Sequence, residues 1–152
     1  MQAKCVARTG DQRSFVIVLD AGEEVFATLV DFAAEHRILA ASLTALGAFE
    51  RATVGWFDFS TKHYRTIPIH EQCEVLSLIG DIAEGDDGKP SLHAHAVLGM
   101  DDGSVRGGHL LEGHVRPTLE IMLVESLAHL RRRKRGDLGI ALIDLEAVPE
   151  AE

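Results

Sequence analysis

Two short segments joined by a tight-turn motif constrain the fold of this chain more than any other feature. Residues 91–99 and residues 104–111 each have the length of a strand, and the first segment alternates in side-chain type. Between them lies the tripeptide Asp-Asp-Gly at positions 101–103. Glycine suits the left-handed position of a three-residue hairpin turn that ends in a bulge. We therefore predict an antiparallel hairpin over residues 91–111.

The register of this hairpin decides whether three histidines share one face. His93 and His95 are two residues apart, so in a strand both side chains point to the same side. A three-residue turn places His109 opposite His95, where Cβ atoms lie about 4.5–5.5 Å apart. A two-residue turn would place Ala96 opposite His109 and turn the His109 ring to the other face. The predicted site depends on the three-residue turn.

Three imidazoles on two neighbouring strands are typical of a divalent metal site. Neutral imidazole binds Zn²⁺, and three protein ligands leave one position open for water or substrate, as in catalytic sites. We predict His93, His95 and His109 as ligands of zinc or another divalent transition metal, because imidazole also suits Cu, Fe and Ni. The alternative is that the histidines simply face solvent. Catalytic residues, and whether the protein is an enzyme, stay open.

The rest of the chain predicts a single α+β domain over residues 1–152, with a mainly antiparallel sheet. From Glu23 to His36, apolar residues recur every three or four positions, which predicts an amphipathic helix. A second, short helix is expected over residues 125–135. Strands are expected at residues 14–19, 41–49, 51–59, 63–69, 73–83, 117–124 and 138–146.

Charge and cysteine content restrict the partners and the compartment. The formal net charge of −9 repels phosphate backbones and anionic lipid, so nucleic acid is not the expected partner of the whole surface. No apolar run approaches the roughly 20 residues of a membrane span, and residues 1–10 lack the apolar core of a signal peptide. Cys5 and Cys73 do not form a disulfide framework. We expect a cytoplasmic protein.

Two further groups of charged residues have both a functional and a simpler interpretation. Residues 131–135, Arg-Arg-Arg-Lys-Arg, could bind phosphate, but such a run in an acidic protein more often balances nearby acids. Glu74, Glu112 and Glu120 could supply a fourth metal ligand or a general base. An exposed position or an interface ion pair is the simpler interpretation of these carboxylates.

Three segments of the chain resemble the plants-and-prokaryotes conserved (PPC) domain, which stands alone in bacteria and archaea and follows an AT-hook in plants. They are residues 41–57, residues 74–80 and, the most specific, residues 93–113 with the sequence HAHAVLGMDDGSVRGGHLLEG. The helical segment fits as well. The resemblance covers residues 12–146, which is nearly the whole chain.

The resemblance implies an antiparallel sheet flanked by helices, a homotrimer, and a zinc site near the subunit interface. His93, His95 and His109 match the three histidines of that site. The fold also looks related to that of acetolactate decarboxylase, a tri-histidine zinc enzyme, so a small-molecule ligand or a metal-assisted reaction is expected. The alternative is a DNA-binding or protein-interaction module like the plant proteins, although the chain has no AT-hook of the R-G-R-P type.

Overall fold

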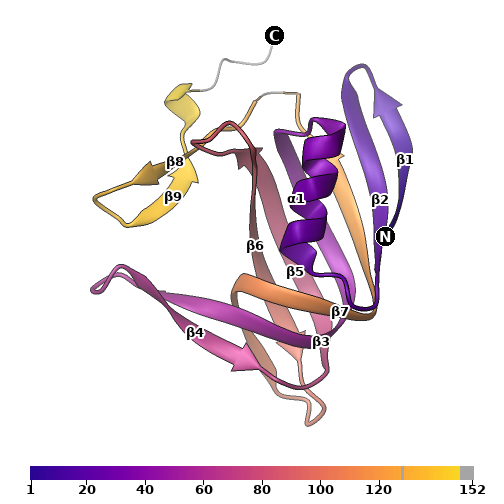
Figure 1. Ribbon diagram of the computed structural model, residues 1–152, viewed down its shortest axis with the longest axis vertical. Coiled ribbons are helices and arrows are strands. Elements are labelled where there is room, and N and C mark those ends of the chain that lie inside the picture. Colours follow the sequence, from indigo (N-terminus) through magenta and orange to yellow (C-terminus); the bar gives the residue numbers. More distant parts are fainter. Residues whose placement is uncertain (128, 148–152) are drawn as a thin grey trace.

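The computed structural model describes residues 1–127 and 129–147, and it consists of one large antiparallel sheet, one α-helix and a small second sheet (Figure 1). The helix is α1, Val25–His36, and a 3₁₀ turn spans Leu145–Ala147. The strands of the large sheet are β1 Gln2–Thr9, β2 Gln12–Asp20, β3 Ala40–Asp58, β4 His63–Ile69, β5 Cys73–Glu84, β6 Pro90–Gly99 and β7 Val105–Glu125. The small sheet is a hairpin of β8 Arg132–Arg135 and β9 Ile140–Ile143.

The large sheet has the strand order β1-β2-β7-β6-β5-β3-β4, and β3 pairs with β7 as well. The pairings of β7, β6, β5 and β3 therefore form a closed cycle. Two pairs of predicted strands are in fact single long strands: residues 41–49 and 51–59 belong to β3, and residues 104–111 and 117–124 belong to β7. The prediction of separate strands was wrong because register shifts between β3 and β7 bend the chain without reversing it.

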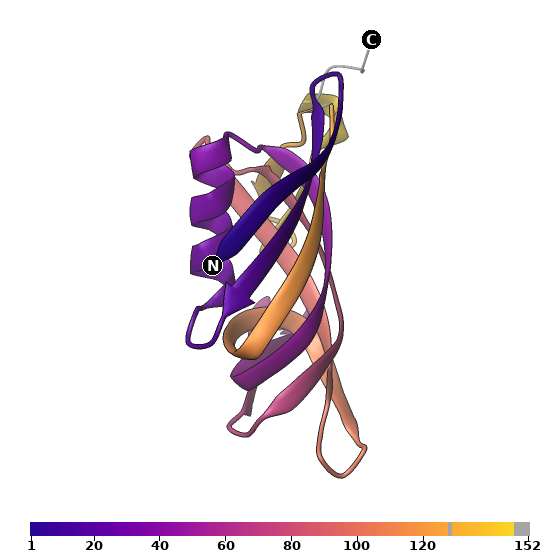
Figure 2. The same ribbon diagram turned by 90° about the vertical axis from the view of Figure 1, so that its right-hand side faces the viewer.

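The helix α1 covers one face of the sheet, as Figure 2 shows from the side. The Glu24 side chain caps its first turn by accepting a hydrogen bond from the Ala27 amide at 2.8 Å. Arg37 ends it in the left-handed conformation with a φ of 55°. The buried side of α1 packs into the core that the sheet also lines. The predicted helix is confirmed, but the description "flanked by helices" was too broad, since the described residues contain one α-helix and one 3₁₀ turn.

We call the other face of the large sheet, which α1 does not cover, the open face. Strand residues alternate between the two faces, so Ala45, Leu78 and Ile121 point into the core while their neighbours point outward. Among the outward side chains, Leu46 is 62% exposed and Ile79 is 57% exposed. Ile79 also lies directly opposite His95, so that histidine shares the open face.

The segment after β7 differs from its prediction. The short helix expected over residues 125–135 was wrong for the described residues, which exclude residue 128: they form an irregular connection followed by β8. The closing strand expected over residues 138–146 is β9, which pairs with β8 instead of joining the large sheet. An arginine run is compatible with a helix end or a strand, and here it pairs with β9 as a strand. The finished fold has no helix that could span a membrane in the described part of the chain.

A substitution at Gly47 tests the bend of β3. Gly47 has a φ of 151°, and a Cβ atom there would lie 2.3 Å from the backbone oxygen of Thr118 in β7. We expect Gly47→Ala to lower the free energy of unfolding by about 2–3 kcal/mol, because backbone at this position cannot move away without breaking the strand pairing. Gly136→Ala is the control, since nothing lies within 4 Å of its added Cβ. Equal urea midpoints for the two variants would contradict this account of the bend.

Candidate metal centre

The β6–β7 hairpin has the predicted three-residue turn. The Met100 amide donates to the Ser104 carbonyl oxygen at 2.9 Å, and Gly103 adopts a φ of 80°. His95 consequently lies opposite His109 in the register of the two strands. The register prediction on which the histidine site depends is confirmed.

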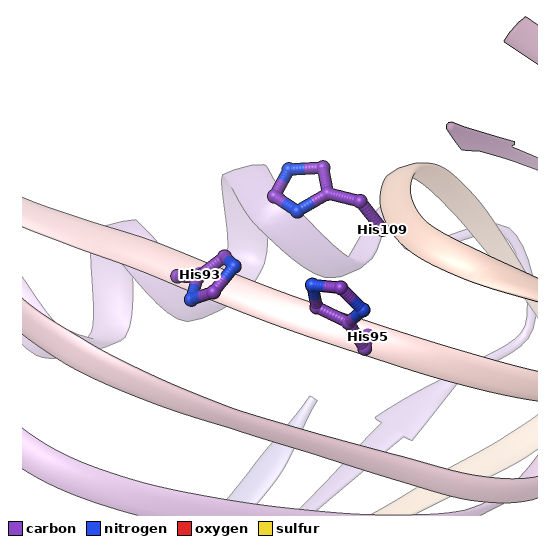
Figure 3. A group of neighbouring side chains, drawn as sticks. All are labelled: His93, His95 and His109. Atoms are coloured by element: carbon purple, nitrogen blue, oxygen red, sulfur yellow. The ribbon is translucent and has the colours of Figure 1, made fainter. Parts of the chain in front are cut away.

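The three imidazole rings meet on the open face of the sheet. The ring centroids of His93 and His95 are 5.1 Å apart, those of His93 and His109 are 5.1 Å apart, and those of His95 and His109 are 5.3 Å apart. One nitrogen of each ring lies within 4.8 Å of the other two. Figure 3 shows these nitrogens facing the space that the rings share, with two rings from β6 and one from β7.

The electrostatics favour the neutral, ligand form of two of the imidazoles, those of His95 and His109. Burial lowers the pKa of His109 to about 4, with further contributions from the nearby charges of His93, His95 and Arg132. Burial also lowers the pKa of His95, and the charge of His93 adds to this effect. Both rings are therefore neutral near pH 7 and keep a lone pair for a metal.

One nitrogen of the cluster is a buried polar atom without a partner. His109 Nδ1 has no hydrogen-bond partner within the described structure. A buried acceptor left unpaired costs about 1–3 kcal/mol, so such atoms in native proteins usually have a ligand, an ion or a water. Three imidazoles around one point, one of them with an unpaired buried nitrogen, fit a divalent transition metal.

Two charged residues lie beside the cluster: Asp81, which the sequence did not single out, and Arg132, which it singled out only as part of the arginine run. Asp81 of β5 faces His93 across the strand pair, and its Oδ2 atom lies 3.4 Å from His93 Nδ1. Arg132 of β8 donates from Nη2 to the other carboxylate oxygen of Asp81, and from Nη1 to the Ser91 carbonyl oxygen at 3.1 Å. Burial alone would raise the pKa of Asp81, but the contact with His93 and the charge of Arg132 outweigh it and lower the pKa. Asp81 is therefore a carboxylate.

A pocket opens beside the rings of His93 and His109. The Tyr64 ring stacks on His109 with centroids 4.7 Å apart and an interplanar angle of 23°, and burial raises the pKa of this tyrosine. Residues 139–142 form a mainly apolar wall, and Arg132, which pairs with Asp81, also lines the pocket. The pocket has space for a small molecule.

The three glutamates considered from sequence do not join the cluster. Among the described residues, only His93, His95 and His109 form a group with metal-ligand spacing. Glu74 and Glu120 are exposed, and Glu112 is exposed and accepts from Nε2 of His114 at 2.6 Å. The simpler interpretation of all three carboxylates agrees with these positions.

The arginine run balances acidic side chains, as the simpler interpretation of that segment predicted. Four ion pairs involve it, namely Arg131 with Glu84, Arg132 with Asp81, Arg133 with Asp144, and Arg135 with Asp137. Because these charges are locally compensated, the run does not form an uncompensated basic patch. The one member with a direct relation to the histidines is Arg132.

Comparison with known proteins agrees with the resemblance seen in the sequence. Residues 7–127 match the Plants and Prokaryotes Conserved domain, abbreviated PCC or PPC. The chain belongs to this family. The matched segment of this PPC-domain protein contains all three histidines and Asp81, and it ends before the β8–β9 hairpin.

Solved structures resemble this PPC-domain protein over most of both chains. A PPC protein of Pyrococcus horikoshii is 33% identical, with a TM-score of 0.82 over 91% of this chain and 97% of that chain. The metal-containing protein of Archaeoglobus fulgidus is 33% identical, with a TM-score of 0.79 over 86% and 91%. A protein of Ralstonia eutropha, named as a proposed DNA-binding protein, is 29% identical, with a TM-score of 0.80 over 86% and 90%.

A more distant likeness confirms the expected relation of the fold to acetolactate decarboxylase. The enzyme of Bacillus subtilis is 12% identical, with a TM-score of 0.56 over 84% of this chain and 58% of that chain. At this identity the likeness concerns the fold alone. No curated protein matches the chain.

Proposed function

We propose that this PPC-domain protein binds a divalent transition metal, zinc in the first instance, through His93, His95 and His109. The observation that carries the proposal is the cluster of three imidazole nitrogens within 4.8 Å, one of which is buried without a hydrogen-bond partner. The metal-containing relative, at 33% identity, supports it. Imidazole ligands also suit other transition metals, so the choice of zinc rests on its preference for three-histidine sites with an open position.

The residues around the cluster define the ligand that the centre would accept. A bound divalent ion supplies a Lewis acid that attracts an anionic or carbonyl oxygen. Histidine binds a metal as the neutral imidazole, so three histidine ligands would not cancel the charge of the ion. Tyr64 and the apolar side chains at residues 140–142 line one side of the adjoining pocket. We therefore propose a small ligand with an oxygen donor at one end and an apolar body, either bound or converted in a metal-assisted reaction.

A zinc-affinity measurement with one ligand removed tests the proposed site. In competition with a chromophoric chelator, His109→Ala is expected to weaken zinc binding at least about 100-fold, because two imidazoles cannot replace three. His70→Ala is the matched control: His70 is exposed and lies outside the cluster. Equal affinities for wild type and His109→Ala would show that zinc binds elsewhere.

We also propose that the protein is a homotrimer, with the open face of the sheet in the subunit contact. Leu46, Ile79 and Met122 are apolar and exposed there, and a shallow groove runs between them. Such a continuous apolar surface on a monomer is typical of an interaction site. The histidine cluster would then lie beside the contact, since Ile79 faces His95.

Light scattering coupled to size exclusion measures this assembly. We expect a trimer for wild type and a monomer for Ile79→Glu, because a charge in the apolar contact would be desolvated without a partner. Leu145→Glu changes an equally apolar side chain, 71% exposed in the 3₁₀ turn, and should leave the trimer intact. A wild-type monomer would refute the proposal.

A second candidate function is DNA binding. Two of the similar structures, those of Ralstonia eutropha and Bacteroides thetaiotaomicron, are named as proposed DNA-binding proteins, which is at odds with the expectation from the charge of −9. The paired arginines and the missing AT-hook weigh against this function. A gel shift with an AT-rich duplex at physiological salt tests DNA binding, and a stable complex would favour this function over the metal-centred one.

Both candidate functions are compatible with the cytoplasmic location that we propose from the two free cysteines.

A further inference from the structure

We propose that Asp81 and Arg132 are positioning residues of the metal centre, and that they make the β8–β9 hairpin a functional part of it. This inference rests on the proposed metal site and adds residues to it. Neither residue lies within the cluster of three histidines. Their role is to hold His93 in the orientation in which it can bind a metal.

Asp81 is placed to orient the ring of His93. It faces His93 across the β5–β6 pair, with its Oδ2 atom 3.4 Å from His93 Nδ1. A carboxylate on this side of the ring favours the tautomer with hydrogen on Nδ1. The other ring nitrogen, Nε2, then keeps its lone pair for the metal. A histidine ligand oriented by a carboxylate in this way is a recurrent feature of metal sites.

Arg132 holds this carboxylate in place. Its side chain is 7% exposed, so its charge would be costly without a partner. The guanidinium contacts Asp81 Oδ1 through Nη2 and the Ser91 carbonyl oxygen through Nη1. Because Arg132 takes one carboxylate oxygen, the other remains directed toward His93. The two residues thus form a chain of contacts from the hairpin to the cluster.

The hairpin itself is attached near the end of β5. The Glu84 amide donates to the Leu130 carbonyl oxygen at 2.7 Å, and Arg131 Nη2 lies 3.5 Å from the Glu84 carboxylate. The Lys134 amide donates to Asp86 Oδ2 at 3.2 Å. These contacts fix the hairpin to the end of β5 and deliver Arg132 to Asp81. Metal binding and hairpin docking are therefore expected to stabilise each other, since coupling between two sites is reciprocal.

Zinc affinity of the full chain tests the positioning role. We expect Asp81→Asn and Arg132→Met to weaken zinc binding by about 10–100-fold without abolishing it, the range found for residues that orient metal ligands. Asp144→Asn is the matched control, because Asp144 pairs with Arg133 on the same hairpin at 3.4 Å and does not contact the histidines. Affinities of all three variants equal to that of wild type would overturn the inference.

The tautomer of His93 provides a readout that a merely structural role would not change. Long-range ¹H–¹⁵N spectra of the metal-free protein report which ring nitrogen carries the hydrogen. They are recorded at pH 7.5, roughly one unit above the ordinary histidine pKa. In wild type, we expect the hydrogen on His93 Nδ1. Asp81→Asn should shift the population toward Nε2–H. Hydrogen on Nε2 in wild type would contradict the inference even if the variants fail to fold. Absence of zinc binding by folded wild type would instead refute the proposed metal site, so the two failures are distinguishable.

Discussion

Saturating zinc is expected to raise the melting temperature of the wild-type protein by about 5–11 °C. A ligand at 100 times its dissociation constant stabilises the folded state by about 2.7 kcal/mol when it does not bind the unfolded chain. In a domain of this size, each 1 kcal/mol corresponds to about 2–4 °C. The gain arises because the three rings are already placed on paired strands, so little ordering is required on binding. Differential scanning fluorimetry after removal of metal by a chelator measures it.

Two controls make this melting experiment specific to the cluster. The triple variant His93→Ala, His95→Ala, His109→Ala should show no zinc-dependent shift, whereas His70→Ala should shift like wild type. Magnesium should have little effect on wild type, since it prefers oxygen ligands. A zinc-dependent shift that persists in the triple variant would mean that the stabilising site lies elsewhere.

Truncation of Phe32 should remove about 3–5 kcal/mol from the free energy of unfolding. Phe32 is 1% exposed on the buried side of α1. Its ring stacks on His36 with centroids 4.1 Å apart and meets Phe15 edge-on at 5.3 Å. Alanine at this position would leave a cavity between the helix and the sheet, and it would remove both aromatic contacts.

Urea denaturation of Phe32→Ala and Phe59→Ala compares a buried with an exposed ring. Phe59 is 75% exposed, so its truncation should change the free energy of unfolding by no more than about 0.5 kcal/mol. A loss below about 1 kcal/mol for Phe32→Ala would mean that α1 contributes little to the core.

The histidine cluster could be predicted because its geometry follows from local rules. The spacing of His93 and His95 decides their common side, and the position of Gly103 decides the turn and therefore the partner of His95. Both facts are contained in a segment of the chain that forms one hairpin. The cluster needed no information about distant parts of the sequence beyond this pairing.

Asp81 and Arg132 could not be predicted in the same way. They are 51 residues apart, and their contact depends on where the β8–β9 hairpin docks on the large sheet. The sequence offers one signal, which is that Asp81 lies near the end of a mostly apolar strand. A partly buried carboxylate in such a strand needs a partner. That signal indicates a partner without identifying it.

The errors in the fold have related causes. The predicted strands 41–49 and 51–59 are separated at Glu50, but β3 continues through this position with bulges in its pairing to β7. The arginine run predicts a helix end, since basic residues favour that position, but most of it forms β8, which pairs with β9, and the run makes ion pairs with the distant acids Glu84 and Asp81. Strand β1 was not predicted, because all of its residues are exposed and no burial pattern marks it.

The most direct test of the metal centre is elemental analysis of purified, untagged protein after incubation with zinc and removal of unbound metal. We expect about one zinc per chain in wild type and nearly none in the variant that replaces His93, His95 and His109 with alanine. The His70→Ala protein should match wild type. Equal metal content in wild type and the triple variant, or no metal in either, would contradict the assignment of these histidines as ligands.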